Sequence, residues 1–139
     1  MRALVNEYPM DPVAEAERYV ENAKEVLKNR GKLDEEHLSY EDPKYVKAAG
    51  HYLWHAVLTA LEAVFHLKKK SNSRIHVERY REQLTIRDKK LLTQVNNAYN
   101  ILHLDMGYDG IQSKRICDEG IRMANEIIER CRTLISSKE

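Results

Sequence analysis

Apolar residues recur every three or four positions near the start of this chain, the spacing that places them on one face of an α-helix. Asp11 and Pro12 pair a capping side chain with the imino acid favoured at the first helical position, so a helix is expected to begin there. It should run to about Asn29 and stop at Gly31. The apolar face of this helix comprises Val13, Ala16, Val20, Ala23 and Leu27.

Asp42 and Pro43 repeat the start signal after a polar, acidic segment that is expected to be a connecting loop. They predict a second helix from residue 43 to about residue 70, since the lone Gly50 costs only about 1 kcal/mol relative to Ala. A helix that is apolar almost all round belongs at the centre of a bundle. The apolar positions are Ala49, Leu53, Trp54, Ala56, Val57, Leu58, Ala60, Leu61, Val64, Phe65 and Leu67.

Three further helices are expected in the rest of the chain. The first is short and contains Val77, Tyr80 and Leu84; the next runs from about Ile86 to Asp105, with Thr85 and Asp88 resembling a capping box. The sequence MGYDG, residues 106–110, predicts a turn. A last helix follows from Ser113 to about Ile135. The two long helices have these core positions: Leu91, Leu92, Val95, Ala98, Tyr99 and Leu102, then Ile116, Gly120, Met123, Ala124, Ile127, Cys131 and Leu134.

The pattern therefore predicts an all-α fold, an up-and-down bundle of four long helices plus one short helix. A chain of 139 residues suits one domain, with residues 1–10 as an extended arm. Five glycines and three prolines are too few for the turns of an all-β protein. No stretch approaches the roughly 18 apolar residues of a membrane span, and no leader pattern opens the chain, so we expect a cytoplasmic protein without membrane contact. Cys117 and Cys131 lie about 21 Å apart on one helix and are expected to be core residues that form no disulfide.

Charge is unevenly distributed along the chain. Residues 1–42 hold six basic and eleven acidic side chains, whereas residues 68–90 hold nine basic and three acidic ones. Three interpretations are open. The acidic and basic regions contact each other in the fold or between subunits, both are simply solvated, or the basic region binds an anionic partner such as RNA. Candidates for nucleic-acid contact are Lys68, Lys69, Lys70, Arg74, Arg79 and Arg81.

A narrow polar wedge interrupts the apolar surface of the second helix, and its side chains can carry chemistry. The candidate ligand-binding residues are His51, His55, Thr59, Glu62 and His66. His51 and His55 have the spacing of metal ligands on one helix face, but His66 lies about 22 Å from His51 along the axis, so at most two could share an ion. We consider three interpretations of the wedge. It faces solvent or a subunit partner, it forms a metal site completed by a residue of another helix, or it forms a polar groove in which Glu62 and His66 bind or process a ligand. His103 and Asp105 are the candidates to complete such a site.

Catalytic motifs are not evident in the sequence. It has no nucleophile elbow, phosphate-cradling glycine loop or metal-type cysteine pairing. We therefore expect no catalytic residues and no cofactor.

The segment YVKAAGHYLWHAVLTALEAVFHL resembles the second helix of HEPN domains, the higher eukaryotes and prokaryotes nucleotide-binding helical bundles. AEAERYVENAKEVL looks like the family's first helix, GYDG precedes the last one, and IRMANEIIERC looks like its closing segment. More narrowly, the chain looks like a small bacterial family, a domain of unknown function related to HEPN. The resemblance implies a helical bundle, frequent homodimers and, in some members, ribonuclease activity or a nucleotidyltransferase partner.

The resemblance does not bring nuclease activity with it. Nuclease members carry Arg, four to six residues and then His near the start of the last long helix. Arg115 is followed at those spacings by Gly120, Ile121 and Arg122. Arg30 and His37 satisfy the spacing but fall in the loop after the first helix, and we interpret that pair as coincidence.

The sequence thus predicts a non-catalytic HEPN-like interaction or small-ligand-binding module that forms a homodimer. A nucleotidyltransferase is the protein partner to test. One alternative is an RNA-directed nuclease or toxin–antitoxin component that uses residues 68–90 and the polar wedge. The other is a metal-binding four-helix bundle.

Overall fold

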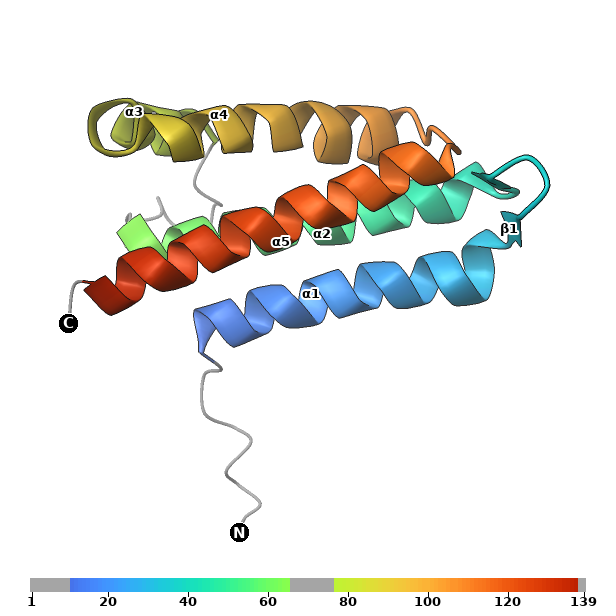
Figure 1. The fold of residues 1–139 in the computed structure, drawn as a ribbon, viewed down its shortest axis with the longest axis horizontal. Coiled ribbons are helices and arrows are strands. Elements are labelled where there is room, and N and C mark those ends of the chain that lie inside the picture. Colours follow the sequence, from blue (N-terminus) through green and yellow to red (C-terminus); the bar gives the residue numbers. More distant parts are fainter. Residues whose placement is uncertain (1–10, 66–76, 138–139) are drawn as a thin grey trace, which may run out of the picture.

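The computed structural model describes residues 11–65 and 77–137. The predicted arm, residues 1–10, lies outside the described residues. The described chain forms five α-helices, two π-helical segments and a two-stranded hairpin (Figure 1). In chain order the elements are α1 (Pro12–Val26), η2 (Leu27–Gly31), β1 (Leu33–Asp34), β2 (Ser39–Tyr40), α2 (Pro43–Phe65), α3 (Val77–Arg87), α4 (Lys89–Ala98), η3 (Tyr99–Tyr108) and α5 (Lys114–Ser137). The predicted all-α bundle is confirmed, with the small hairpin as an addition to the loop after the first helix.

Both Asp-Pro pairs start helices as the sequence predicted. The Asp11 carboxylate accepts a hydrogen bond from the Val13 amide at 3.0 Å, and the Asp42 carboxylate accepts one from the Lys44 amide at 3.0 Å. Each carboxylate satisfies an amide that the first helical turn leaves without a backbone partner.

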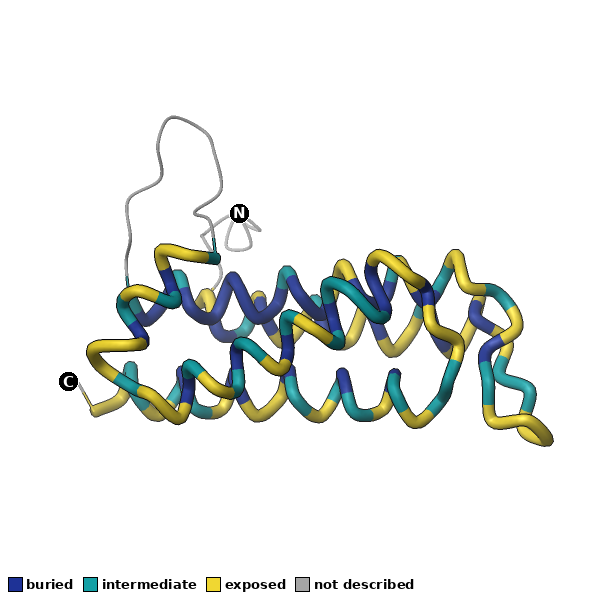
Figure 2. Tube along the Cα trace, turned by 90° about the horizontal axis from the view of Figure 1, so that it is seen from above, coloured by how far each residue is buried: buried dark blue, intermediate teal, exposed yellow. Residues whose placement is uncertain are grey.

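Helix α2 lies at the centre of the bundle, packed against α1, η3 and α5 (Figure 1). Its Leu53, Val57 and Leu61 are completely buried. Figure 2 shows buried positions continuing along this helix. The predicted central helix is confirmed over residues 43–65, and its continuation to residue 70 lies outside the described residues.

The corner between α3 and α4 differs from the prediction. Asp88 is the N-cap of α4, and its carboxylate accepts a hydrogen bond from the Leu91 amide at 3.0 Å. Thr85 lies inside α3, where its hydroxyl donates to the Arg81 carbonyl at 2.7 Å. The expected cap at Thr85 was therefore wrong by three residues, because Thr85 satisfies its hydroxyl within the preceding helix.

Residues 106–108 of the predicted turn are helical, because η3 continues α4 to Tyr108. Gly107 and Gly50 allow η3 and α2 to approach closely: a Cβ atom at Gly50 would lie 2.5 Å from the Gly107 nitrogen and 2.7 Å from the Leu102 carbonyl oxygen. Gly107 is thus required for packing. The turn itself begins at Asp109 and continues through Gly110, which has a positive φ of 64°.

The hairpin connects the first part of the chain to the start of α5. Leu33 pairs with Tyr40, and Asp34 with Ser39. On its outer side, the Tyr40 amide donates to the Gln112 carbonyl at 2.8 Å, and the Lys114 amide donates to the Leu38 carbonyl at 2.9 Å. These bonds fix the hairpin against the N-terminal end of α5.

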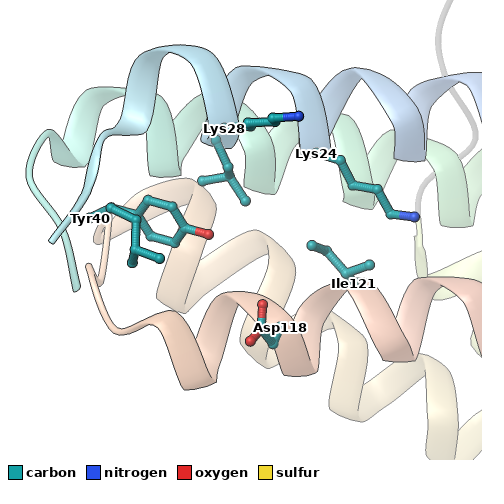
Figure 3. A pocket seen from close by; sticks show the side chains of 7 residues that line it. Lys24, Lys28, Tyr40, Asp118 and Ile121 are labelled. Atoms are coloured by element: carbon teal, nitrogen blue, oxygen red, sulfur yellow. The ribbon is translucent and has the colours of Figure 1, made fainter. Parts of the chain in front are cut away.

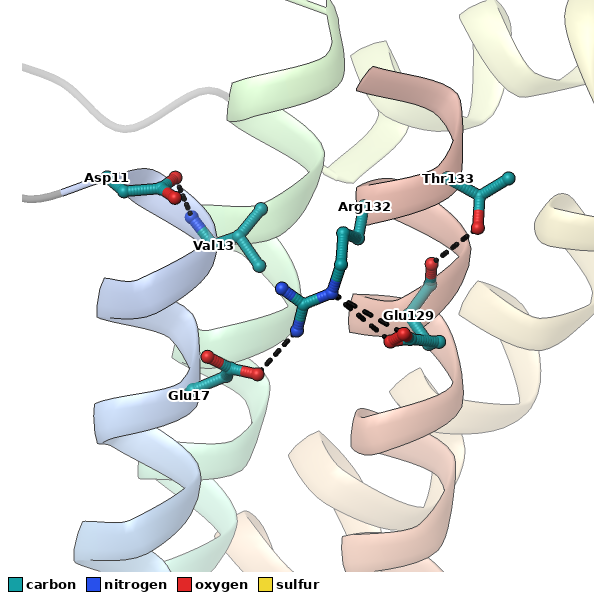
Figure 4. A network of polar contacts seen from close by, with 6 residues as sticks. All are labelled: Asp11, Val13, Glu17, Glu129, Arg132 and Thr133. Atoms are coloured by element: carbon teal, nitrogen blue, oxygen red, sulfur yellow. Dashed lines mark hydrogen bonds and ion pairs between the residues drawn. The ribbon is translucent and has the colours of Figure 1, made fainter. Parts of the chain in front are cut away.

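At the opposite end of the bundle, Arg132 of α5 reaches Glu17 of α1 and Glu129 on its own helix (Figure 4). These groups are well exposed, so the ion pairs orient the two helices and contribute little to stability. Cys117 and Cys131 are buried free thiols, as expected. Within the described residues, every helix is too short or too polar to cross a lipid bilayer.

Candidate ligand-binding site

The residues of the predicted polar wedge differ in burial and in neighbours along α2. His51 is exposed and its ring faces η3, since a Cβ atom at Gly107 would lie 3.7 Å from it. His55 is half-buried with its ring perpendicular to that of Tyr19 on α1, at a centroid distance of 4.3 Å. Thr59 is buried and Glu62 is half-buried, whereas His66 lies outside the described residues.

The candidates to complete the wedge, His103 and Asp105, lie on η3. His103 packs against Tyr99, with ring centroids 5.0 Å apart, and against Trp54 at 6.1 Å. In the described part of the chain, the three potential metal ligands that gather within 4.8 Å of one another are Asp34, Glu36 and His37 at the hairpin, a group that excludes His51 and His55. Metal binding by His51 and His55 remains a prediction.

The basic segment is described only in part. Arg79 is exposed, whereas Arg81 donates to Glu78 and to the Asn96 side chain, both at 2.7 Å, and stacks on the Tyr99 ring. These contacts give Arg81 a structural role. Lys68, Lys69, Lys70 and Arg74 lie outside the described residues.

A cavity of about 470 Å³ lies between α1 and α5, beside the hairpin (Figure 3). Figure 3 shows Lys24 and Lys28 extending from the α1 side, Ile121 and Asp118 on α5, and the Tyr40 ring between the two helices. Leu27 and Leu33 complete the apolar lining. The cavity therefore combines apolar walls with two cationic side chains.

Local structure explains why these side chains gather there. Leu27 is the last position of the α1 apolar stripe and is 2% exposed. Tyr40 is held by the bonds between β2 and the Gln112 backbone and is 8% exposed. The pKa of the Tyr40 hydroxyl is raised above its ordinary value, mainly by burial and to a smaller extent by the electrostatic effect of Cys117 and Asp118. The hydroxyl therefore stays neutral and able to donate a hydrogen bond.

Within the described residues, two of the three charged side chains that line the cavity, Asp118 and Lys24, are already in ion pairs, whereas Lys28 is not. Asp118 forms an ion pair with Lys114 at 2.5 Å, and Lys24 forms an exposed one with Glu21 at 3.4 Å. Lys28 has no hydrogen bond or ion pair within residues 11–65 and 77–137. An anionic group could therefore pair with Lys28 without displacing another side chain.

A second cavity, of about 740 Å³, adjoins the hairpin and the first turns of α5 and also borders Asp118. Its lining includes His37 and Arg115, a combination that no pattern in the sequence indicated. The other lining residues are Leu38, Ser113, Lys114, Asp118, Glu119 and Arg122.

A family model described as a domain of unknown function, DUF5618, matches residues 11–133. The chain belongs to this family. The DUF5618 match includes every residue that lines the two cavities. A comparison with curated proteins found no match.

Among solved structures, the chain is similar to a protein of unknown function from Dyadobacter fermentans. The two are 35% identical with a TM-score of 0.78, over 89% of this chain and 95% of the other. A bacterial relative of the DUF5618 chain therefore has the same fold over nearly its full length.

Sequence reasoning did not find the cavity between α1 and α5. Lys28 belonged to none of the predicted sites, and Tyr40 fell in a segment predicted to be a loop. The one available signal was an aromatic residue within an otherwise polar, acidic segment. Nothing in the periodicity of α1 or α5 indicates that their ends enclose a space.

Proposed function

We propose that this chain is a non-catalytic helical-bundle module that binds a small amphipathic anion between α1 and α5. The observation that carries the proposal is the cavity lined by Leu27, Leu33 and Ile121, with Lys24 and Lys28 at its edge. Apolar walls with a few polar groups are typical of small-molecule sites.

The walls suit an apolar ligand body. The volume of about 470 Å³ lies within the range of roughly 300–1,000 Å³ usual for small-molecule sites. An alkyl or aromatic group placed against Ile121 and Leu33 would leave water and gain about 25 cal/mol for each Å² of apolar surface buried. Tyr40 adds a ring face and a neutral hydroxyl at one end.

The edge suits an anionic head group. Lys24 and Lys28 are four residues apart, about one helical turn, and both line the cavity from the α1 side. Asp118 on the facing helix already pairs with Lys114, so its charge is largely neutralised. A carboxylate near Lys28 would therefore meet a net positive edge.

Decanoate and decanol test the proposal, because they share an alkyl chain and differ in charge. Isothermal titration calorimetry should detect decanoate binding to the wild-type protein, with decanol binding more weakly. Lys28→Gln should weaken decanoate binding about fivefold, the size of one exposed charge pair, and leave decanol binding unchanged. Lys90→Gln, which removes an exposed lysine from α4, is the matched control and should change neither.

Ile121→Glu tests the apolar wall. A carboxylate at this position opposes both the alkyl chain and the head group, so binding of both probes should disappear. Ile86→Glu introduces the same change at a side chain that is 81% exposed on α3, and should leave binding intact. Equal binding of decanoate to the wild-type and Ile121→Glu proteins would refute the site.

We also propose what the resemblance to HEPN domains implies. The chain is related to HEPN domains, forms a homodimer in the cytoplasm and has a nucleotidyltransferase as its protein partner. The similarity of YVKAAGHYLWHAVLTALEAVFHL to HEPN domains supports them. Light scattering after size-exclusion chromatography tests the dimer, with a mass near twice 16.3 kDa expected. A mass of one chain across the micromolar range would remove it.

RNA binding is the second candidate, favoured by the exposed Arg79, Lys89 and Lys90 near the corner of α3 and α4. The side chain of each lacks a hydrogen-bonded or ionic partner within the part of the chain that the structure describes. Replacing all three with Gln should lower RNA affinity and the salt dependence of binding together. A filter-binding assay with labelled RNA at two salt concentrations measures both, and any cleavage would favour the nuclease alternative.

A further inference from the structure

The second cavity carries an inference that does not depend on the ligand proposed between α1 and α5. This cavity of about 740 Å³ opens between Leu38 at the hairpin and the first turns of α5. Its lining is rich in hydrogen-bond donors, contributed by His37, Ser113, Lys114, Arg115 and Arg122. Such a set is suited to a ligand with several acceptor oxygens.

Most charges at this cavity are already paired. Lys114 pairs with Asp118 at 2.5 Å, and Arg122 forms ion pairs with Glu119 and Glu126. His37 donates to or accepts from Asp34 through Nδ1 at 2.8 Å. Both acidic side chains that line the cavity in the described part of the chain, Asp118 and Glu119, are therefore already paired with a cation.

Arg115 is the exception among the lining cations. It is exposed and has no hydrogen bond or ion pair within the described residues. Its guanidinium therefore contributes a positive charge that no neighbour pairs with directly. A guanidinium presents a planar fork of donors that matches the oxygens of a phosphate group.

The backbone adds to this positive potential. Arg115 lies in the first turn of α5, a helix of 24 residues, where aligned peptide dipoles place partial positive charge. The Ser113 hydroxyl oxygen accepts from the Ile116 amide at 3.2 Å, which leaves the hydroxyl proton able to donate elsewhere. The cavity thus has a cationic side chain, a hydroxyl and the positive end of the α5 dipole in one place.

The size and one apolar wall define the rest of the ligand. Leu38 lines the cavity and is 57% exposed, which is high for a large apolar side chain. Inorganic phosphate would leave most of the volume empty and Leu38 uncovered. We infer that this second cavity binds a small organic phosphate monoester, whose phosphate pairs with Arg115 and whose apolar group covers Leu38.

Phenyl phosphate, phenol and inorganic phosphate are the probes that separate the parts of this inference. In a titration followed by nuclear magnetic resonance of backbone amides, phenyl phosphate should shift the signals of Leu38, Ser113 and Arg115. Phenol should bind at least tenfold more weakly, because it lacks the charged group. Inorganic phosphate should also bind at least tenfold more weakly, because it lacks the ring.

Arg115→Gln should weaken phenyl phosphate binding at least tenfold and leave the thermal stability of the bundle unchanged, since the side chain is exposed. Arg79→Gln removes the same charge from α3 and should change nothing. Lys28→Gln should also leave phenyl phosphate binding unchanged, which separates this site from the one between α1 and α5. Unaltered affinity in Arg115→Gln, or shifts confined to residues away from this cavity, would overturn the inference; equal binding of inorganic phosphate would overturn the organic part.

Discussion

The Asp88 carboxylate accepts two hydrogen bonds from the Arg130 guanidinium, with Nε at 3.0 Å and Nη2 at 2.8 Å from Oδ2. Its other oxygen caps α4 through the Leu91 amide. One side chain therefore closes the corner between α3 and α4 and fastens it to α5. The Asp88 side chain is only 10% exposed, the lowest value for any acidic group in the ion pairs within the described residues, whereas Arg130 is 41% exposed.

Asp88→Ala should lower the free energy of unfolding by about 2–3 kcal/mol, because it removes both a helix cap and a charged hydrogen-bond partner. Urea denaturation followed by circular dichroism measures the loss. Asp11→Ala is the matched control: it removes a cap at an exposed position, where we expect a loss of about 1 kcal/mol. Equal losses in the two variants would show that Arg130 adds nothing to the role of Asp88.

The same residue predicts a dependence of stability on acid. Burial alone would raise the pKa of the Asp88 carboxyl, but hydrogen bonds from the Leu91 amide and the Arg130 guanidinium outweigh it and hold the pKa below its ordinary value. The folded state therefore binds this proton less readily than the unfolded state does. The stabilisation is complete above the unfolded pKa of about 3.9 and is lost as the pH falls through the lower folded value.

Comparison of the wild-type protein with Asp88→Asn between pH 6 and pH 2.5 isolates this contribution from those of other carboxylates. The difference in unfolding free energy between the two should shrink below about pH 4. A difference that stays constant through the acid range would contradict the lowered pKa.

Gly50→Ala should destabilise the bundle by several kcal/mol, although Ala favours helices by about 1 kcal/mol over Gly. The added Cβ would overlap the backbone of η3 at Gly107 and Leu102, which side-chain rotation cannot relieve. Gly120→Ala should be milder, because its Cβ would meet the ends of the Leu102 and Met106 side chains at 2.9 Å. Thermal melting of both variants checks the order, and a smaller loss in Gly50→Ala would show that η3 moves away easily.

Both cysteines should resist alkylation in the folded protein. Cys117 and Cys131 are fully buried, and that burial raises the pKa of each thiol to about 12. At pH 8 roughly one thiol in ten thousand is ionised, and iodoacetamide reacts with the thiolate. Mass spectrometry should show no adduct without denaturant and two in guanidinium chloride. Rapid modification of the native protein would mean that α5 opens readily.

The helices could be predicted where local chemistry and burial agree. All five residues of the predicted α1 stripe, from Val13 to Leu27, are buried. The corner at Asp88 was placed wrongly because Thr85 and Asp88 both suit a cap, and only packing against Arg130 on α5 favours the second. Gly107 suggested a turn because a glycine needed for close packing has the same sequence signature as one needed for positive φ.

The candidate site was beyond prediction from the sequence for a different reason. Lys28, Tyr40 and Ile121 come from the end of the first helix, the hairpin and the last helix. Hydrophobic periodicity tells which face of each helix is buried, but not which helix ends lie opposite one another. A cavity is a property of that arrangement, whereas the predicted wedge on α2 needed only one helix.

The bonds that attach the hairpin to the start of α5 and the residues just before it join positions far apart in the chain; Tyr40 and Gln112, for example, are 72 positions apart. During synthesis, a chain that has emerged from the ribosome only as far as Gln112 lacks the α5 wall of both cavities. A ligand of the kind proposed for either cavity would therefore recognise the protein only after α5 has been made and could not guide its earlier folding. Its effect would be to slow turnover of molecules that have already matured, by mass action on the native state.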